Sequence, residues 1–305
     1  MIRMFTAVLL SACLLGKPFA AIAGERMDTL VSAEWLAENI NAEDLVVIDS
    51  TVRVLFAEDG TMSNESGLSS YKAAHIPKAR FADLLIDMSA PGQELAMPSP
   101  ERFAAALGAL GIKNTDRVVI YSTDYFVWAT RLWWMMRWIG HDQVAVLDGG
   151  MRAWEEAGLH VTGESIPIAA TTYSVHLRPE LISDQADVIS AIANKDTMII
   201  DALSPSHYRG EVTMYQRAGH ISTALNVPTN ELTDGEGRLR PDDELELLIG
   251  APAGTDIITY CGGGVAATGP AFAAFRAGVK NVSVYAGSLE EWTSNPDNPM
   301  TLGEE

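Results

Sequence analysis

Short apolar runs rich in β-branched residues alternate with amphipathic stretches along most of the chain. Compact apolar runs bounded by turn-forming residues predict buried strands, and they lie at 45–49, 117–121, 144–147, 197–201, 256–260 and 282–285. Apolar residues at helical spacing predict helices, which we place at 32–39, 100–110, 127–139, 151–157, 184–194, 242–248, 265–277 and 288–293. Strand–helix alternation favours an α/β fold in which a mostly parallel sheet is flanked by helices.

Four blocks of the first half recur in the same order in the second half. The pairs are LVVIDS (45–50) with MIIDAL (198–203), AAHIPKARF (73–81) with AGHISTALN (218–226), DRVVIYS (116–122) with TDIITYC (255–261), and VAVLDGGMRAW (144–154) with VSVYAGSLEEW (282–292). An ordered repeat of this kind indicates one domain that has been duplicated. We therefore expect tandem domains over 24–165 and 166–305, with the linker near 162–171.

The first 23 residues differ from the rest of the chain. Arg3 precedes an apolar run over 5–15, and the tripeptide AIA at 21–23 matches an A-x-A cleavage site. This pattern is typical of a signal peptide, and the run is shorter than the ~20 apolar residues that a membrane span needs. We expect residues 1–23 to be removed and the protein to be exported to a bacterial periplasm. The alternative is a lipoprotein anchored through Cys13, which ends a lipobox-like LSAC.

Composition narrows the classes of function. The chain has 21 Lys and Arg against 40 Asp and Glu, a formal charge of −19, and 48% hydrophobic residues. The hydrophobic fraction is typical of a globular protein. Because such an acidic surface repels the phosphate backbone, we expect no nucleic-acid partner. A small anionic substrate is still possible, because a local site can differ from the net field. The two cysteines, Cys13 and Cys261, exclude a disulfide scaffold and a Cys-rich zinc site.

The two copies differ at one informative place. Ser122 is followed by Thr-Asp-Tyr-Phe-Val, whereas Cys261, at the matching position, is followed by Gly-Gly-Gly-Val-Ala. We call residues 261–266 the cysteine loop and residues 122–127 the counterpart loop. A nucleophile in one copy only predicts one active site and one structural copy, although a buried, inert cysteine beside a glycine turn is the alternative. Arg131, just beyond the counterpart loop, could point into the cleft between the domains.

Three glycines after Cys261 suit a site for an anion. Gly262, Gly263 and Gly264 follow the carboxyl end of a predicted strand, where open α/β sheets bind ligands. Glycines let the backbone curl so that its N–H groups point inward, with the next helix N-terminus behind them. Such a field stabilises a thiolate and an anionic adduct on its sulfur. Ala267 stands where a cysteine phosphatase needs Arg, and Gly264 where a C-x-x-C redox site needs Cys, so both classes are disfavoured.

These residues resemble the two-domain rhodanese family, the thiosulfate and 3-mercaptopyruvate sulfurtransferases, over about residues 28–299. The motifs that carry the resemblance are AHIPKARF (74–81), RLWWMMRWIGHDQVAVLDGGMRAWEEAG (131–158), AGHISTALNVP (218–228), YCGGGVAAT (260–268) and YAGSLEEW (285–292). The resemblance implies two rhodanese-like domains and a nucleophilic cysteine, Cys261, in the second alone. It implies that sulfur passes from a small anionic donor to cyanide or a thiol through a Cys261 persulfide, with no metal or organic cofactor. We expect a monomer.

The cysteine loop departs from both types of loop in the family. Thiosulfate-type loops look like C-R-K-G-V-T and mercaptopyruvate-type loops like C-G-S-G-V-T. The pattern here, with Val265 following Gly264, is closer to the mercaptopyruvate type, but Gly263 has no hydroxyl and Ala266 replaces the usual Thr. Both classes of donor therefore stay open, and so does a rhodanese-like sulfur carrier or binding module with little turnover.

Four further residues are candidates for binding the donor. The resemblance implies a substrate-gripping Arg where this chain has His207, and Arg209 or Arg217 could substitute for it. His75 matches a position that faces the active site in mercaptopyruvate enzymes. His75 and His220 also occupy the same place in a repeated block, however, and this favours a structural turn role for the pair.

Overall fold

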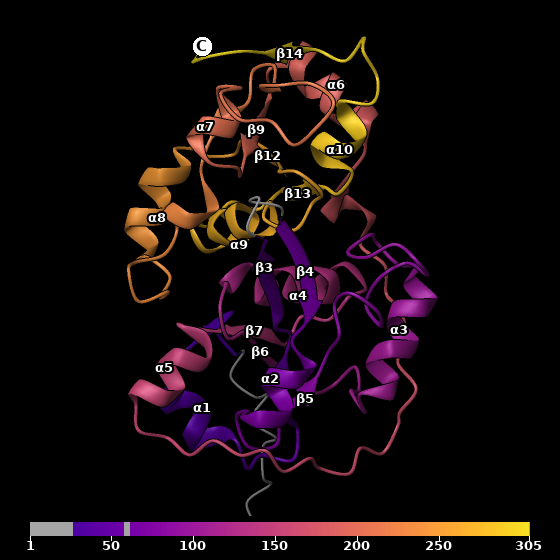
Figure 1. The fold of residues 1–305 in the computed structure, drawn as a ribbon, viewed down its shortest axis with the longest axis vertical. Coiled ribbons are helices and arrows are strands. Elements are labelled where there is room, and N and C mark those ends of the chain that lie inside the picture. Colours follow the sequence, from indigo (N-terminus) through magenta and orange to yellow (C-terminus); the bar gives the residue numbers. More distant parts are fainter. Residues whose placement is uncertain (1–26, 58–61, 305) are drawn as a thin grey trace, which may run out of the picture.

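The computed structural model describes residues 27–57 and 62–304, so the predicted signal segment and Cys13 lie outside the described residues. Figure 1 shows two α/β units, the first in indigo to magenta and the second in orange to yellow. Each has one five-stranded sheet flanked by helices. The predicted fold class, two tandem α/β domains, is confirmed.

Both five-stranded sheets are parallel throughout and have the same strand order. In the first sheet the order is β1 (Leu30–Val31), β7 (Val144–Leu147), β6 (Arg117–Tyr121), β2 (Leu45–Asp49) and β5 (Arg80–Phe81). In the second it is β8 (Ile182–Ser183), β13 (Val282–Tyr285), β12 (Asp256–Tyr260), β9 (Thr197–Asp201) and β11 (Leu225–Asn226). Strands β6 and β12, which precede the two loops, hold the same central position.

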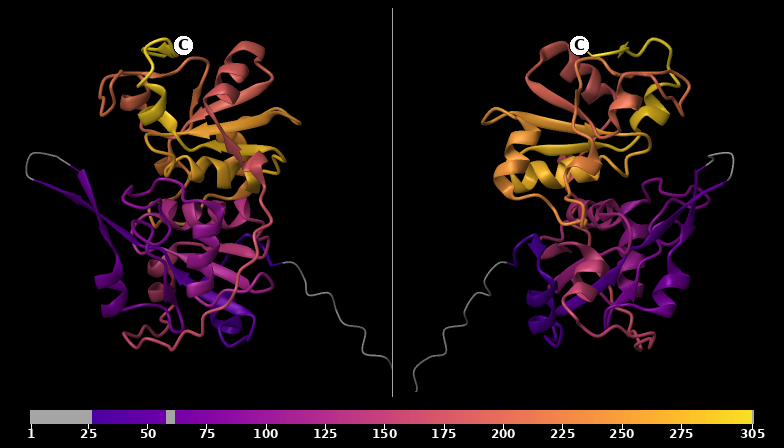
Figure 2. Two further views of the ribbon diagram at one scale, coloured as in Figure 1. Left: turned by 90° about the vertical axis from the view of Figure 1, so that its right-hand side faces the viewer. Right: turned by 60° about the vertical axis from the view of Figure 1, so that its left-hand side comes forward.

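The six strands predicted from the apolar runs have the predicted bounds. Sequence reasoning missed the two-residue edge strands and two antiparallel pairs, β3 (Val52–Phe56) with β4 (Met62–Ser66) and β10 (His220–Ile221) with β14 (Met300–Thr301). Figure 2 shows the β3–β4 pair projecting from the first domain alongside the second. Edge strands this short carry no periodicity, which explains why the pattern did not predict them.

The predicted helices form within a few residues of their expected limits. The first domain contains α1 (Ala33–Asn39), α2 (Leu68–Ala73), α3 (Pro100–Ala109), α4 (Phe126–Trp138) and α5 (Gly150–Glu156). The second contains α6 (Gln185–Asn194), α7 (Pro205–Tyr208), α8 (Asp242–Ile249), α9 (Thr268–Arg276) and α10 (Ser288–Trp292), and short 3₁₀ turns lie at Pro179–Leu181 and Thr229–Glu231. Capping side chains set three of the starts, at Ser32, Ser99 and Asp184.

The main seam between the domains is an apolar contact between α4 and α9. The ring centroids of Trp133 and Phe272 lie 4.8 Å apart at 90°, an edge-to-face geometry that favours aromatic pairs. The hydroxyls of Thr130 and Thr268 share a buried hydrogen bond of 2.9 Å across the same seam. One continuous cluster of buried residues includes side chains of both helices. The domains are therefore packed together by a shared core.

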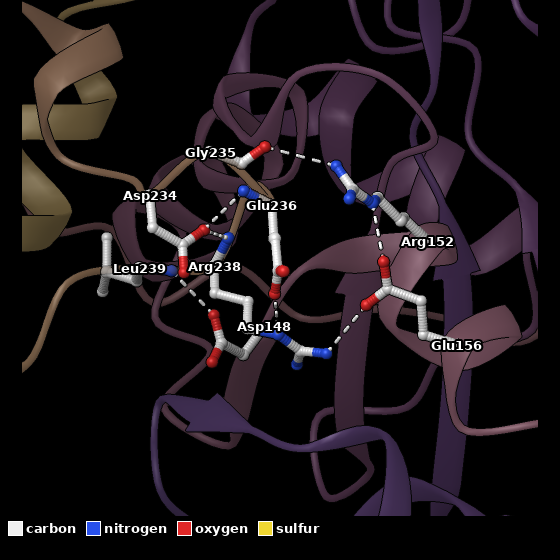
Figure 3. A network of polar contacts seen from close by, with 8 residues as sticks. All are labelled: Asp148, Arg152, Glu156, Asp234, Gly235, Glu236, Arg238 and Leu239. Carbon is white, nitrogen blue, oxygen red and sulfur yellow. Dashed lines mark hydrogen bonds and ion pairs between the residues drawn. The ribbon is translucent and has the colours of Figure 1, made fainter.

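A second, polar contact joins the domains at their surface (Figure 3). The Asp148 carboxylate, after β7, accepts a hydrogen bond from the Leu239 backbone N–H at 2.8 Å. Arg152 in α5 donates to the Gly235 carbonyl at 3.3 Å, and Arg238 pairs with Glu156 at 3.1 Å. Exposed ion pairs such as the last contribute little to stability. This contact positions the 234–239 segment of the second domain on the first domain, and the apolar seam supplies the larger burial.

The chain passes between the domains along the surface of the first one. Residues 164–178 have no regular secondary structure and run along the edge of the first domain (Figure 1). The Thr171 N–H donates to the Gly108 carbonyl at 2.9 Å, and the His176 N–H to the Ile139 carbonyl at 3.0 Å. Among the described residues, no helix is long and apolar enough to cross a membrane.

Candidate active site

Strand β12 delivers Cys261 to the carboxyl edge of the second sheet. The strand is paired on both sides, with β9 and with β13, and four of its five residues are buried. Cys261 follows directly and is 3% exposed. The carboxyl edge of an open α/β sheet is where such folds bind ligands, so the strand places the sulfur where the sequence led us to expect a site.

Residues at the start of α10 form hydrogen bonds with the backbone of the cysteine loop. Ser288 Oγ accepts a hydrogen bond from the Cys261 N–H at 3.1 Å and donates to the Tyr285 carbonyl at 2.8 Å. The Leu289 N–H donates to the Cys261 carbonyl at 3.1 Å, and the Glu290 N–H to the Gly262 carbonyl at 2.9 Å. The first turn of α10 therefore fixes the path of the loop backbone.

Gly264 brings its N–H to the sulfur. This N–H donates to Cys261 Sγ at 3.1 Å, and the residue has φ +80°. A Cβ at this position would lie 2.5 Å from the Ala286 carbonyl oxygen, so only glycine fits without strain. A backbone donor aimed at the sulfur stabilises its anionic form. The predicted inward-pointing N–H is thus present at Gly264.

The helix after the loop begins later than predicted. We expected it from Val265, but α9 starts at Thr268, and residues 262–267 form bends and turns. The left-handed backbone of Gly264 interrupts the helical path. The N-terminus of α9 is therefore separated from the glycines by a further turn, and the α10 start supports the loop instead.

Arg131 supplies a buried positive charge behind the cysteine loop. It comes from α4 of the first domain and donates to the Gly264 carbonyl at 3.1 Å and to the Leu95 carbonyl at 2.9 Å. Burial lowers the pKa of this guanidinium to about 10, and attraction to Cys261 opposes that effect. Arg131 is therefore charged at neutral pH. Arg131 was predicted to point into the cleft between the domains. Its guanidinium does reach the second domain, but it bonds to backbone carbonyls there and at Leu95 and does not face open space.

Sequence reasoning missed Tyr215 and Glu290, which flank the loop. A Cβ on Gly262 would lie 1.6 Å from the Tyr215 hydroxyl oxygen, so this hydroxyl occupies the space beside Gly262. A Cβ on Gly263 would lie 3.5 Å from Glu290 Oε2. Burial raises the pKa of Tyr215, and the negative charges of Cys261 and Glu290 raise it further. Tyr215 lies in an irregular segment between α7 and β10, and no sequence pattern marks it.

The structure does not bring His75 to the site. His75 is 1% exposed, stacks on Tyr71 at 4.1 Å, and its Nδ1–H donates to the Tyr71 carbonyl at 2.7 Å. In the second domain His220 does the same with Tyr208, at 3.7 Å and 2.8 Å. These contacts favour the structural turn role that the repeat predicts for the pair. The His75 ring is packed inside the first domain, so no contact in this structure supports the expectation that it binds substrate, which stays a prediction.

Arg209 and Arg217 are both engaged elsewhere. Arg209 pairs with Glu211 at 2.7 Å and with Glu304 at 3.5 Å. Arg217 donates to the Asn295 and Asn298 carbonyls at 3.1 and 2.8 Å. Neither guanidinium contacts the cysteine loop through these bonds, so the idea that one of them substitutes for a substrate-gripping Arg stays a prediction. Glu211 is a near neighbour of Arg209 in the sequence, whereas Glu304 and the two partners of Arg217 lie far along the chain, where sequence spacing gave no sign of them.

His207 faces a cavity between the domains and not the sulfur. Its Nδ1 shares a hydrogen bond with Ser204 Oγ at 2.8 Å. The cavity has a volume of about 730 Å³ and lies over the counterpart loop. Ala266 reaches its wall, whereas residues 261–265 do not. Of the predicted binding residues, Gly262, Gly263 and Gly264 thus surround Cys261, while His207 and Ala266 line a neighbouring cavity.

Comparisons with known proteins agree with this arrangement. The profile of the rhodanese-like domain matches residues 32–157 and 184–295. The chain is 32% identical to the 3-mercaptopyruvate sulfurtransferase of Escherichia coli K12, covering 88% of this chain and 96% of the relative. It is 30% identical to the thiosulfate sulfurtransferase of Gallus gallus, covering 86% and 92%. A crystal structure of an Escherichia coli 3-mercaptopyruvate sulfurtransferase superposes with a TM-score of 0.76 at 31% identity, over 86% of this chain and 99% of that one.

Proposed function

The chain belongs to the rhodanese family and is a sulfurtransferase, and we propose that Cys261 carries the transferred sulfur as a persulfide. One observation supports this assignment above the others: the Gly264 N–H donates to Cys261 Sγ at the carboxyl edge of the sheet. The counterpart loop has a serine at the matching position. Both the thiosulfate and the 3-mercaptopyruvate sulfurtransferases are among the relatives.

The reaction follows from a stabilised thiolate in two steps. The Cys261 thiolate attacks the sulfur of 3-mercaptopyruvate, an S–S bond forms, and the C–S bond breaks. The electron pair of that bond leaves with the pyruvate enolate, which then takes a proton from solvent. An acceptor thiolate or cyanide next attacks the outer sulfur of the persulfide and releases the Cys261 thiolate. This is nucleophilic covalent catalysis, and the Gly264 N–H stabilises negative charge on the sulfur at each stage.

We infer that a mercaptopyruvate-type donor suits this loop better than thiosulfate. Gly262 and Gly263 stand where a thiosulfate-type loop carries two cations. Arg131 lies behind the loop and is bonded to backbone carbonyls. No loop side chain is therefore placed to hold a dianion over the sulfur, and a donor with one carboxylate needs less compensation.

The test is steady-state turnover of 3-mercaptopyruvate and of thiosulfate, with cyanide or a thiol as acceptor. Wild-type protein is expected to turn over many times, and Cys261→Ser is expected to lose turnover by about 10³-fold or more. Mass spectrometry after donor alone should show one extra sulfur on Cys261. If wild type transfers a single equivalent of sulfur and then stops, the protein is a sulfur carrier and the proposal of an enzyme fails.

We further propose that the protein is exported to a bacterial periplasm as a monomer. The apolar run at 5–15 and the tripeptide at 21–23 support removal of residues 1–23. The rhodanese-like match begins at residue 32, downstream of that segment. Intact mass of the protein from fractionated cells tests this: a chain beginning at Gly24 in the periplasmic fraction is expected. A lipidated chain beginning at Cys13 would instead indicate membrane anchoring, and size-exclusion chromatography with light scattering tests the monomer.

A further inference from the structure

The cysteine loop carries no side-chain hydroxyl, yet a hydroxyl from elsewhere stands beside it. Gly263 and Ala266 occupy the two places where the loop could have carried one. The Tyr215 hydroxyl oxygen lies against Gly262, 1.6 Å from the position that a Cβ on that residue would take. Tyr215 can be this close only because residue 262 is glycine. The pair therefore forms one feature of the site, in which a phenol from another segment takes the space of a loop side chain.

Tyr215 is fixed by hydrogen bonds to its backbone and by packing of its ring, while its hydroxyl is left available. Thr213 Oγ1 accepts from the Tyr215 N–H at 3.3 Å and donates to the Tyr215 carbonyl at 3.2 Å. The ring packs against the buried cluster that contains Tyr260 and Leu289, on either side of the loop. Within residues 27–57 and 62–304, no protein acceptor takes a hydrogen bond from the Tyr215 hydroxyl. It is thus a positioned donor without a partner.

We propose that Tyr215 is a catalytic hydrogen-bond donor that contacts the oxygens of an α-keto thiol donor while the enolate leaves Cys261-bound sulfur. This inference rests on the proposed sulfurtransferase function. In that step negative charge grows on the keto oxygen of the departing pyruvate. A fixed donor aimed at developing charge in a partly buried site lowers the barrier more than one in water does. No proton needs to leave Tyr215, since solvent protonates the enolate carbon.

The charges around Tyr215 keep it in the donor form. Burial raises the pKa of the phenol, and the negative charges of Cys261, Glu290 and Asp201 raise it further. The phenol therefore remains protonated across neutral pH and cannot serve as a base. The Glu290 carboxylate near Gly263 also disfavours a dianion at the mouth of the loop. Both features favour an α-keto thiol with a single carboxylate over thiosulfate.

Tyr215→Phe is the sharpest test, because it removes the hydroxyl and keeps the ring. We expect kcat and kcat/KM for 3-mercaptopyruvate to fall together by about 10²-fold, the size typical of losing one oxyanion donor. The thermal unfolding midpoint and the rate of Cys261 alkylation by iodoacetamide should stay within error of wild type. Tyr125→Phe, which removes a half-exposed hydroxyl of the counterpart loop, is the matched control and should leave turnover unchanged.

Two further variants separate the hydroxyl from packing. Gly262→Ala keeps the phenol but displaces it, since the new Cβ takes its space, so turnover should fall as in Tyr215→Phe and the two losses should not add. Gly263→Ser places a hydroxyl on the loop at a position with no contact closer than 3.5 Å. In the Tyr215→Phe background it should restore at least part of the lost kcat.

The outcomes distinguish this inference from the proposed function. If wild type turns over 3-mercaptopyruvate and Tyr215→Phe stays within twofold of it, the role of Tyr215 is refuted and the enzyme assignment stands. If Tyr215→Phe loses activity with a matching loss of thermal stability and no rescue by Gly263→Ser, Tyr215 only packs the loop and the inference is again refuted. If wild type itself forms no Cys261 persulfide, it is the proposed function that fails.

Discussion

The cysteine loop and the counterpart loop follow matching strands and share one backbone contact, but their first side chains have opposite hydrogen-bonding roles. In each, a carbonyl at the start of the loop accepts from the helix that follows the next strand: Met151 N–H to Ser122 and Leu289 N–H to Cys261, both at 3.1 Å. In the counterpart loop the Ser122 hydroxyl then donates to the Tyr125 carbonyl at 2.7 Å. In the cysteine loop the direction reverses, and the Gly264 N–H donates to the sulfur.

This reversal decides which copy can hold an anion. Ser122 must keep its proton to make its bond, whereas Cys261 accepts a bond that grows stronger when its proton leaves. The residues at matching distance explain the difference, because Gly264 has φ +80° and Tyr125 has φ −118°. The φ of −118° at Tyr125 suits a residue with a side chain. The φ of +80° at Gly264 would be strained for any residue except glycine. The loop backbone, and not only the nucleophile, therefore separates the two copies.

The first domain nevertheless contributes to the site of the second. Arg131, nine positions after Ser122, extends from α4 to the Gly264 carbonyl. The residue nine positions after Cys261 is Pro270, so the second domain has no matching cation to support the counterpart loop. After duplication, one copy thus carries the nucleophile and the other carries a buried cation that supports its loop.

Moving the thiol to the counterpart loop is expected to produce the largest effect. In Ser122→Cys/Cys261→Ser, the new thiol would have no Gly264-type donor, because Tyr125 presents its carbonyl there. We expect turnover of 3-mercaptopyruvate to remain at the Cys261→Ser level, about 10³-fold or more below wild type. Ser122→Cys alone, in which Cys261 is intact, is the control and should keep wild-type turnover. Measurable turnover by the double variant would show that the loop backbone is not decisive.

Giving the cysteine loop a side chain where the counterpart loop has one should cost less. Gly264→Ala introduces a Cβ 2.5 Å from the Ala286 carbonyl oxygen at φ +80°, so the loop must shift and the N–H must leave the sulfur. We expect kcat/KM to fall by about 10²-fold, as when one fixed donor is lost. Gly263→Ala is the matched control, because its Cβ meets only Glu290 Oε2 at 3.5 Å. Equal losses in both variants would contradict the role given to Gly264.

The central strands could be read from the sequence because burial on both faces leaves uninterrupted apolar runs. The helices capped by Ser32, Ser99 and Asp184 begin within one residue of the starts that the apolar spacing predicts. The sequence predicted a mostly parallel sheet but not the order of its strands, because that order depends on which strands pair across long distances in the chain. The two-residue edge strands carry no local pattern, and long-range pairing alone creates them.

The site was predictable at Cys261 and Gly264 and much less so around them. Cys261 was marked by a difference between two repeats, which is information the chain itself contains. Tyr215 could not be found that way, because its contact with Gly262 depends on the path of an irregular segment. The bonds of Arg217 could not be foreseen either, because its partners, the Asn295 and Asn298 carbonyls, lie far along the chain. For His75 the resemblance gave a position but no burial, whereas its recurrence in both copies predicted the packed position that the structure shows.

The last prediction concerns stability and not turnover, and involves the buried aspartates that end β2 and β9, one in each copy. Asp201 accepts from the Leu203 N–H at 2.8 Å and Asp49 from the Thr51 N–H at 2.9 Å. Burial raises the pKa of Asp201 from 3.8 to about 6, with the Tyr260 hydroxyl and the Leu203 N–H opposing it. Burial also raises the pKa of Asp49.

A carboxyl with a raised pKa makes the folded protein bind more protons than the unfolded one between about pH 4 and 6. The free energy of unfolding should therefore decrease as the pH rises through that window, by up to about 3 kcal/mol from Asp201. Urea unfolding of wild type and Asp201→Asn from pH 4 to 7.5 measures this, since the variant lacks the group and should show a flatter profile. Asp49→Asn should flatten the profile in the same direction. Parallel profiles for wild type and Asp201→Asn would contradict the raised pKa of Asp201, because they would mean that this carboxyl is ionised at no cost in the fold.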